Sequence, residues 1–133
     1  MKIFLHINSL DGCSLHRLIL PYSEVEKSTD EFTFMAHYSK KDMTLEEKID
    51  EIGQYDVLIF HRILPDGMLD GIRQKYPHVK IVIDMDDAWQ LNDKHPSYWF
   101  YRKNGITDKI LYHLKNADFV TCTTDYLANK IRQ

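Results

Sequence analysis

The sequence is poor in cysteine and glycine and has no strong excess of charge, and each shortage excludes a class of protein. Its 133 residues include two cysteines, Cys13 and Cys122, too few and too far apart for a disulfide framework, so we expect a reducing, cytoplasmic compartment. A net charge of -3 gives no general attraction to nucleic acid, so no nucleic-acid partner is expected. No stretch approaches the roughly 20 apolar residues of a spanning helix, although peripheral contact at the inner face of a membrane is left open.

Short β-branched runs alternate with helical patterns along the whole chain, which predicts an α/β fold. Strands are predicted at Lys2–Ile7, Phe32–Ala36, Asp56–Phe60, from Ile81 and at Ala117–Cys122; helices at Leu15–Leu20, from Leu45, from Met68, at Ile106–Leu114 and Asp125–Arg132. We expect residues 1–133 to form a single doubly wound, Rossmann-like domain with a mainly parallel sheet of about five strands and helices on both faces. In the usual strand order 3-2-1-4-5, the first and fourth strands are neighbours.

Capping signals predict where helices begin and end. Ser14 is the expected N-cap of the first helix, and Pro21 its expected end. Thr44 and Glu47 have the spacing of a capping box. Either Thr123 or Thr124 is expected to cap the last helix.

The strand that begins at Ile81 ends in three carboxylates, Asp84, Asp86 and Asp87, followed by Trp89. Ligands of open α/β sheets bind at the carboxyl ends of the strands, so this acidic tip is the first candidate site. Crowded carboxylates repel, which raises the pKa of at least one of them, and Asp86 or Asp87 is the candidate acid/base catalyst. In the simpler alternative, Asp87 caps the next helix and the other two carboxylates are solvated.

Further candidate residues lie in neighbouring loops. Gly12 and Arg17 follow the first strand, and His61 and Arg62 follow the third. Two roles are open for each arginine. It donates a bidentate pair of hydrogen bonds to a phosphate or carboxylate of a ligand, or it forms an ion pair with the acidic tip. One glycine does not make the dinucleotide fingerprint, which needs three. A metal ion held by the aspartates with His61 or His95 is the weaker alternative, and no metal is predicted.

The irregular segment Gln90–Tyr101 is rich in aromatic residues. Long loops in compact domains are often functional. Together with Trp89, the rings of Tyr98, Trp99 and Tyr101 either stack on a sugar or cover the sheet edge.

Several of these pieces resemble one family. The resemblance is to the amino-terminal half of GT-B-fold glycosyltransferases related to the group 1 and family four enzymes, and it is carried by Val82–Trp89, His95-Pro96-x-Tyr98, Ala117–Thr124 and Leu127–Ala128. It implies transfer of a sugar from a nucleotide-sugar donor to a glycan or other acceptor, in cell-surface polysaccharide or glycoconjugate synthesis, with no tightly bound cofactor. The acceptor would be bound mainly by this half. The donor would be bound by a second Rossmann-like domain that the sequence lacks, so this domain alone is expected to be inactive.

On this basis the expected catalytic residues are Asp86 and Asp87. The expected acceptor- or donor-binding residues are Gly12, Arg17, His61, Arg62, Asp84, Trp89, His95, Tyr98 and Thr124. The rival interpretation is a stand-alone flavodoxin-like or receiver-like signalling or binding module without transferase activity. A receiver is expected to carry an acidic pair after its first strand, where this sequence has only Asp11.

Overall fold

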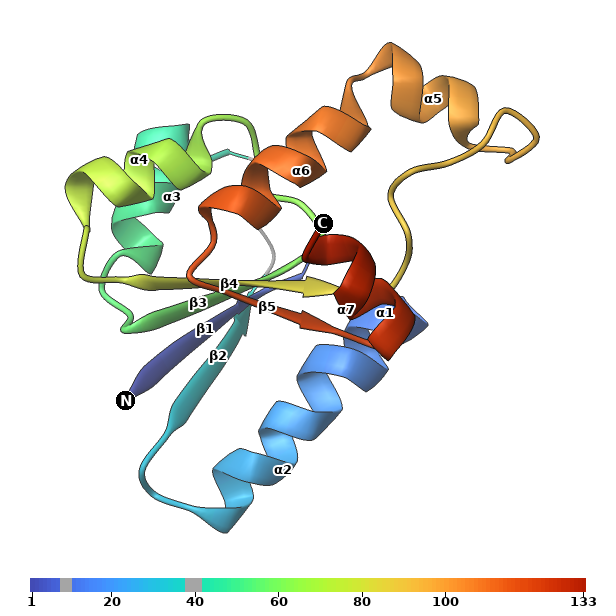
Figure 1. Cartoon of the computed structure of the whole chain (residues 1–133). Helices are drawn as coiled ribbons and strands as arrows, with labels where there is room; N and C mark the ends of the chain where they lie inside the picture. Colours follow the sequence, from blue (N-terminus) through green and yellow to red (C-terminus); the bar gives the residue numbers. More distant parts are fainter. Residues whose placement is uncertain (8–10, 38–41) are drawn as a thin grey trace.

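A computed structural model describes residues 1–7, 11–37 and 42–133, so the predicted turn at residues 8–14 is described only from Asp11 onward. Its centre is a five-stranded sheet in which all paired strands are parallel (Figure 1). The strands are β1 (Lys2–His6), β2 (Thr33–His37), β3 (Val57–His61), β4 (Lys80–Met85) and β5 (Phe119–Cys122). The predicted fold class, a single α/β domain with a parallel sheet and flanking helices, is confirmed.

Helices cover both faces of the sheet (Figure 1). They are α1 (Gly12–Ser14), the π-helical segment η1 (Leu15–Ile19), α2 (Leu20–Ser28), α3 (Leu45–Ile52), α4 (Met68–Lys75), α5 (Tyr98–Lys103), α6 (Ile106–Asn116) and α7 (Asp125–Ile131). Helices α3, α4 and α6 lie on one face, and α2 lies on the other. Within the described ranges, no helix is long and apolar enough to cross a membrane.

The strand order differs from the one expected. It is β2-β1-β3-β4-β5, so β3 lies between β1 and β4, and the predicted contact between the first and fourth strands is wrong. The first two strands pair directly and the third returns to the other side of β1, which places the reversal of strand order between β1 and β3. The end of β3, with His61 and Arg62, therefore occupies the middle of the carboxyl edge.

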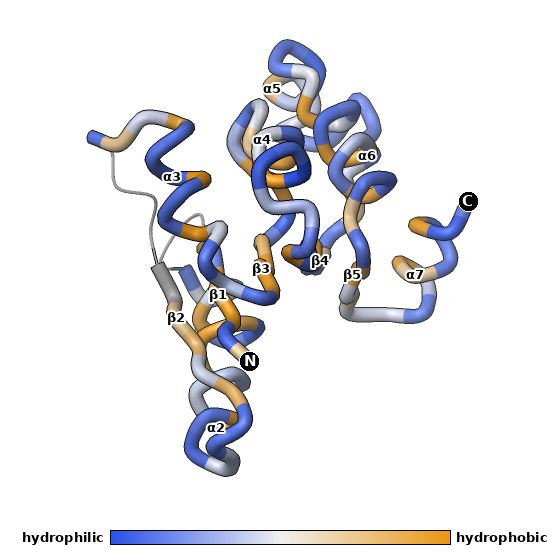
Figure 2. The backbone as a smooth tube through the Cα atoms, turned by 90° about the vertical axis from the view of Figure 1, so that its left-hand side faces the viewer, coloured by the Kyte–Doolittle hydropathy of each residue, from blue (hydrophilic) through white to orange (hydrophobic). Residues whose placement is uncertain are grey.

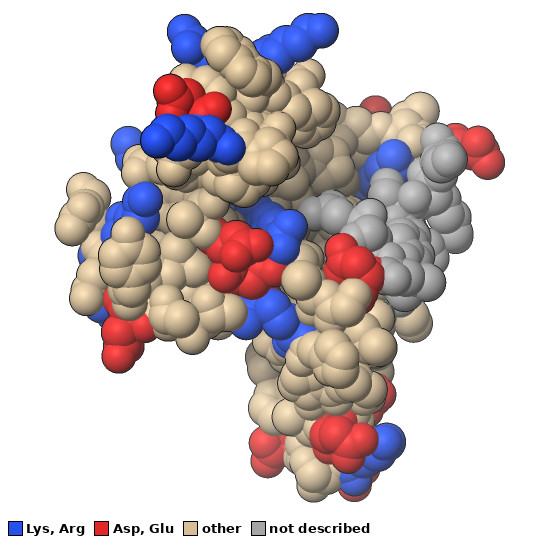
Figure 3. All heavy atoms as spheres, turned by 90° about the vertical axis from the view of Figure 1, so that its right-hand side faces the viewer, with Lys and Arg blue, Asp and Glu red and all other residues tan. Residues whose placement is uncertain are grey.

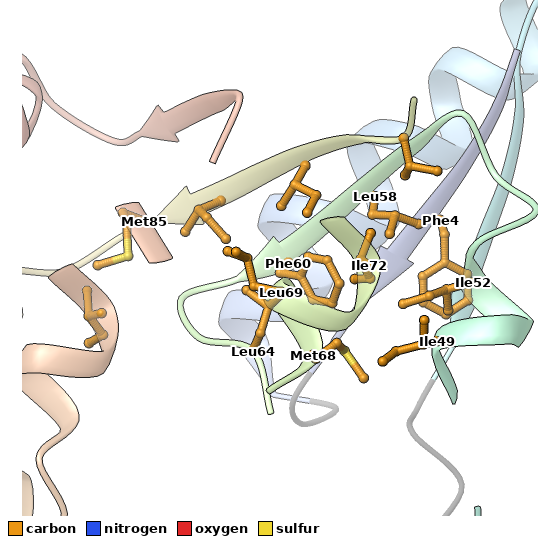
Figure 4. Packing of buried hydrophobic residues seen from close by; sticks show 14 of the residues in the cluster. Phe4, Ile49, Ile52, Leu58, Phe60, Leu64, Met68, Leu69, Ile72 and Met85 are labelled. Carbon is orange, nitrogen blue, oxygen red and sulfur yellow. The ribbon is translucent and has the colours of Figure 1, made fainter. Parts of the chain in front are cut away.

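Two hydrophobic clusters hold the layers together. The larger one packs β3 and β4 against α3, α4 and α6 (Figure 4), with Phe60, Ile72 and Ile83 fully buried. The smaller one packs the other face of β1 against η1 through Leu5 and Leu18. The hydropathy colouring in Figure 2 follows this division, with orange along the strands and blue over much of the helices. Strands buried on both faces explain the continuous apolar runs of the sequence.

The first helix does not end at Pro21. It begins one turn earlier than expected, capped by Asp11, whose carboxylate accepts from the backbone N–H of Ser14 at 2.8 Å. The prediction of Ser14 as the cap is therefore wrong. Helix α2 then runs through Pro21 to Ser28. Because η1 closes wider turns, with the Leu20 N–H bonding the Leu15 carbonyl, the proline ring sits in the first turn of α2 without needing an N–H of its own.

The other capping predictions hold. Thr44 and Glu47 form the predicted capping box, and Thr124 accepts from the Leu127 N–H as the cap of α7. Observed element ends lie within one or two residues of those predicted for β3, α6 and β5. The segment Gln90–Tyr101 is less irregular than expected, because its last four residues begin α5.

Candidate functional site

The carboxyl edge of the sheet gathers charged side chains from β3, β4 and the η1 segment. Figure 3 views this edge, where red carboxylates near the centre lie between blue basic groups. The strand register brings His61 beside Asp84, and Asp84 beside Thr121. The acidic tip of β4 is thus surrounded by polar groups of its neighbours.

Arg17 reaches the end of β4 from η1. Its guanidinium donates two hydrogen bonds to the carboxylate of Asp84, at 2.8 and 2.6 Å, and the Thr121 hydroxyl donates a third at 2.6 Å. These hydrogen bonds and the charge of Asp84 raise the pKa of Arg17 against the opposing effect of burial. The Asp84 carboxylate is buried and fully engaged, so the alternative in which Arg17 pairs with the acidic tip is the one observed.

Arg62 forms a second bidentate pair, with Asp86. Both of its bonds to the carboxylate measure 2.5 Å, and the Asp86 side chain is 8% exposed. Burial opposes ionisation of Asp86, but the hydrogen bonds and charge of Arg62, with a smaller contribution from His61, outweigh it and hold the pKa of Asp86 well below its usual range. Crowding by the other carboxylates therefore does not raise the pKa of Asp86, because its nearest charged neighbour is an arginine.

The backbone of Arg62 is left-handed, with φ 67°, which is uncommon for a residue with a side chain. Its N–H donates to the Asp84 carbonyl at 2.9 Å, beyond the last pair of the β3–β4 register. This turn directs the side chain across the edge to Asp86. Strained backbone of this kind costs of order 1–3 kcal/mol and is found at functional sites.

His61 lies buried beneath these pairs. Its Nε2 is 3.4 Å from a carboxylate oxygen of Asp86, and its Nδ1 is 3.5 Å from the hydroxyl of Ser14. The Asp86 carboxylate also acts on the exposed thiol of Cys13 and raises the pKa of this thiol. Asp86 is therefore the shared partner of groups at the end of β3 and in α1, and Gly12 lies exposed at the start of α1.

Asp87 differs from the other two carboxylates. Its side chain is 81% exposed, and Arg62 approaches it only at 3.4 Å. It lines a pocket of about 310 Å³ between the end of β4, α5 and α6. The pocket is lined by Arg62, Met85, Asp87, Ala88, Trp89, Leu91, His95, Ser97, Tyr101 and Ile110.

Trp89 forms one wall of this pocket. It is 2% exposed and belongs to the larger core cluster, so its ring is part of the core. Its indole N–H has no hydrogen-bond acceptor among the residues that the structure describes. A buried donor without an acceptor carries a desolvation cost of about 1–3 kcal/mol that a ligand oxygen would offset.

The remaining predicted residues divide between the pocket and structural roles. His95 lines the pocket, and its Nδ1 accepts from the Ser97 N–H at 3.1 Å. Tyr98 lines an adjacent smaller pocket of about 190 Å³. Thr124 caps α7, and its hydroxyl is occupied in that role.

Tyr101 and Ser14 lie at the site but are absent from the expected catalytic and binding residues, although Tyr101 was one of the aromatic rings considered for stacking on a sugar. Tyr101 lines both pockets, and its spacing of three residues from Tyr98 on one helix was the available signal. Ser14 was taken for a cap, so nothing in the sequence pointed to its contact with His61. No group of three His, Cys, Asp or Glu side chains placed to hold a metal ion occurs in residues 1–7, 11–37 and 42–133.

Comparison with known proteins gives only distant likenesses in structure. No family model and no curated protein matches the sequence. Among solved structures, the chain is similar to the response regulator RcsB from Salmonella enterica serovar Typhimurium, bound to promoter rprA in the presence of phosphomimetic BeF3-. The match covers 99% of this chain and 95% of that chain, with a TM-score of 0.50 and 10% sequence identity. At this identity the likeness shows the fold alone.

Two predictions change with this comparison. The expectation of no nucleic-acid partner is withdrawn as a correction, because the similar structure is a complex with DNA. Of the two functional predictions, the flavodoxin-like or receiver-like module is supported better than the glycosyltransferase, on which nothing found bears. The chain is therefore an α/β domain of flavodoxin-like strand order.

Proposed function

We propose that the chain is a binding module whose pocket beside Trp89 takes a sugar or a similarly polyhydroxylated ligand. The observation that carries the proposal is the composition of this pocket. It combines a buried indole N–H without an acceptor, the exposed carboxylate of Asp87 and the aromatic ring of Tyr101. Small-molecule sites are mostly apolar pockets with a few converging polar groups, and this one has that character.

Each group has a distinct part in binding a sugar. The Asp87 carboxylate accepts hydrogen bonds from two adjacent hydroxyls, in the manner of a bidentate acceptor. The Trp89 N–H donates to a ring or hydroxyl oxygen. The Tyr101 ring offers a flat apolar surface for the C–H face of a pyranose. A volume of about 310 Å³ suits one or two sugar rings.

The test is a titration with common mono- and disaccharides, followed by backbone amide NMR. We expect shifts centred on Trp89 and Tyr101, and about tenfold weaker binding in Asp87→Asn, since a hydrogen bond to a charged group contributes roughly 1.5–3 kcal/mol. Asp30→Asn serves as the control, because Asp30 is also an exposed aspartate but lies outside the pocket. Two results contradict the proposal. One is that the amide chemical shifts change only at residues outside the pocket, and the other is that Asp87→Asn binds the sugar with the same affinity as the wild type.

A second candidate is the acceptor side of a glycosyltransferase, favoured by the sequence pieces that resemble that family. It predicts that the pocket binds a glycan without nucleotide, and that a nucleotide sugar does not displace the glycan. Competition between the two at one site would count against an acceptor role. Robust turnover of common nucleotide sugars by this chain would contradict the expectation that it is inactive alone.

A further inference from the structure

Helix α5 turns two large aromatic side chains away from the rest of the protein. Trp99 is 67% exposed and Phe100 is 63% exposed. Figure 1 shows the helix projecting at the edge of the molecule, beyond α6. Tyr98 and Tyr101, from the other side of the same helix, line the two pockets. Trp99 and Phe100 are therefore outside the core clusters of the described residues, and their exposure leaves apolar surface in water.

Basic groups flank these rings. The guanidinium of Arg102 lies over the Trp99 ring at 5.8 Å from its centroid, and Lys103 follows Phe100 by three residues, on the same face of the helix. Lys94 lies exposed in the preceding loop. Residues 94–103 carry three cationic side chains and no carboxylate, and blue side chains stand at the top of Figure 3, where α5 projects. The positive charge is local, because the chain as a whole is acidic.

We propose that this α5 surface, formed by Trp99, Phe100, Arg102 and Lys103, docks on an anionic lipid bilayer. Tryptophan is enriched at the boundary between headgroups and acyl chains, where its ring is apolar and its N–H is solvated. Lysine and arginine beside it are attracted to anionic headgroups by about 1 kcal/mol each. An exposed apolar pair flanked by Arg102 and Lys103 is complementary to such a surface.

Docking through this surface also orients the pocket. Tyr101 contributes to the pocket from the inner side of α5, so a bilayer contact on the outer side holds the pocket entrance close to the headgroups. The docking proposal rests on α5 alone and does not require the sugar ligand proposed above. Loss of sugar binding and loss of vesicle binding are therefore separate outcomes.

The experiment measures partition onto vesicles of phosphatidylcholine that contain about one third phosphatidylglycerol. The chain has two tryptophans, and only Trp99 is exposed, so its fluorescence reports the contact directly. We expect a shift of emission to shorter wavelength with anionic vesicles, a smaller response with pure phosphatidylcholine, and weaker binding at high salt.

Two double variants test the aromatic rings and the cationic side chains of this surface separately. Trp99→Ala with Phe100→Ala, and Arg102→Gln with Lys103→Gln, are each expected to weaken partition about tenfold or more, with sedimentation as the readout for the first. Phe119→Ala removes an equally exposed ring on β5 and is expected to leave partition unchanged.

Three results overturn the proposal. They are absence of binding to the anionic vesicles, retention of binding in both double variants, and equal loss in Phe119→Ala. A dimer in sedimentation velocity that Trp99→Ala with Phe100→Ala abolishes, without vesicle binding by the wild type, would assign the surface to a second copy of the chain instead.

Discussion

The variant Arg62→Met tests the energetic role of the Arg62–Asp86 pair. Methionine keeps most of the apolar stem and removes the charge, so the Asp86 carboxylate, 8% exposed, loses its two shortest hydrogen bonds. Removing one partner of a fully buried pair costs about 3–5 kcal/mol. Because the Arg62 side chain is 34% exposed, water can replace part of the loss, and we expect about 2 kcal/mol at pH 7. This loss of unfolding free energy is measured by urea denaturation, with circular dichroism as the signal.

The pH dependence gives an independent check. Arg62 holds the pKa of Asp86 below its ordinary value of 3.8, so the stabilisation is complete at pH 7. As the pH falls below that value, the unfolded chain takes up the proton before the folded one, and wild-type stability declines. In Arg62→Met, burial favours the protonated form of Asp86 and is opposed only by the smaller contributions of His61 and of a backbone hydrogen bond. The stability difference between wild type and variant is therefore expected to narrow from pH 7 to pH 3.

A double-mutant cycle with Asp86→Asn separates the pair from changes at each residue alone. We expect a coupling free energy of about 1–3 kcal/mol at pH 7. A coupling below about 0.5 kcal/mol, or a stability difference that stays constant between pH 7 and pH 3, would refute the assignment of this pair as the main partner of Asp86. Lys27→Met, which breaks the exposed pair with Glu24, is the control and should change stability little.

Three further predictions concern other positions. Arg62→Gly is expected to be about 1 kcal/mol more stable than Arg62→Ala in urea unfolding, because only glycine adopts the left-handed backbone without strain; equal stabilities would contradict the strain. His113 is buried, which lowers its pKa, and its Nδ1 accepts from the Leu64 N–H, so wild-type stability should fall as the pH drops below about 6.5, and His113→Gln should flatten this profile. Gly53→Ala would place a Cβ 2.3 Å from the Tyr76 ring, and thermal unfolding should show a loss of about 1–3 kcal/mol, where no loss would mean that the ring moves freely.

The fold was predictable because its signals are local and repeated. Each strand is a short apolar run, and each helix has its own capping or periodicity signal, as with Thr44 and Glu47. The strand order was not predictable in the same way. Whether β3 or β4 pairs with β1 depends on whether the chain crosses back to the free side of β1 after its second strand or after its third. Both arrangements satisfy the right-handed crossover rule.

The sequence was enough to predict where in the fold the candidate site lies, but not which of its side chains contact one another. Residues that follow parallel strands must meet at one edge, so Asp84, Asp86 and His61 could be brought together from the sequence. The partner of each carboxylate could not, because Arg17 and Arg62 reach the edge from positions 67 and 24 residues away. A guanidinium is long enough to reach either a ligand or a neighbouring carboxylate, and only the packing decides between the two.

These pairings separate the two carboxylates that the sequence left equivalent. Asp86 forms an ion pair with Arg62 and lies close to His61 and Cys13. Asp87, by contrast, is exposed and lines the pocket. Asp86→Asn is therefore expected to lower the melting temperature and to affect ligand binding only indirectly. Asp87→Asn should leave the melting temperature close to that of the wild type and weaken ligand binding directly. If Asp87→Asn instead lowers stability while binding stays intact, the exposed carboxylate has a structural role, and a ligand at this edge must be recognised by the aromatic wall of the pocket alone.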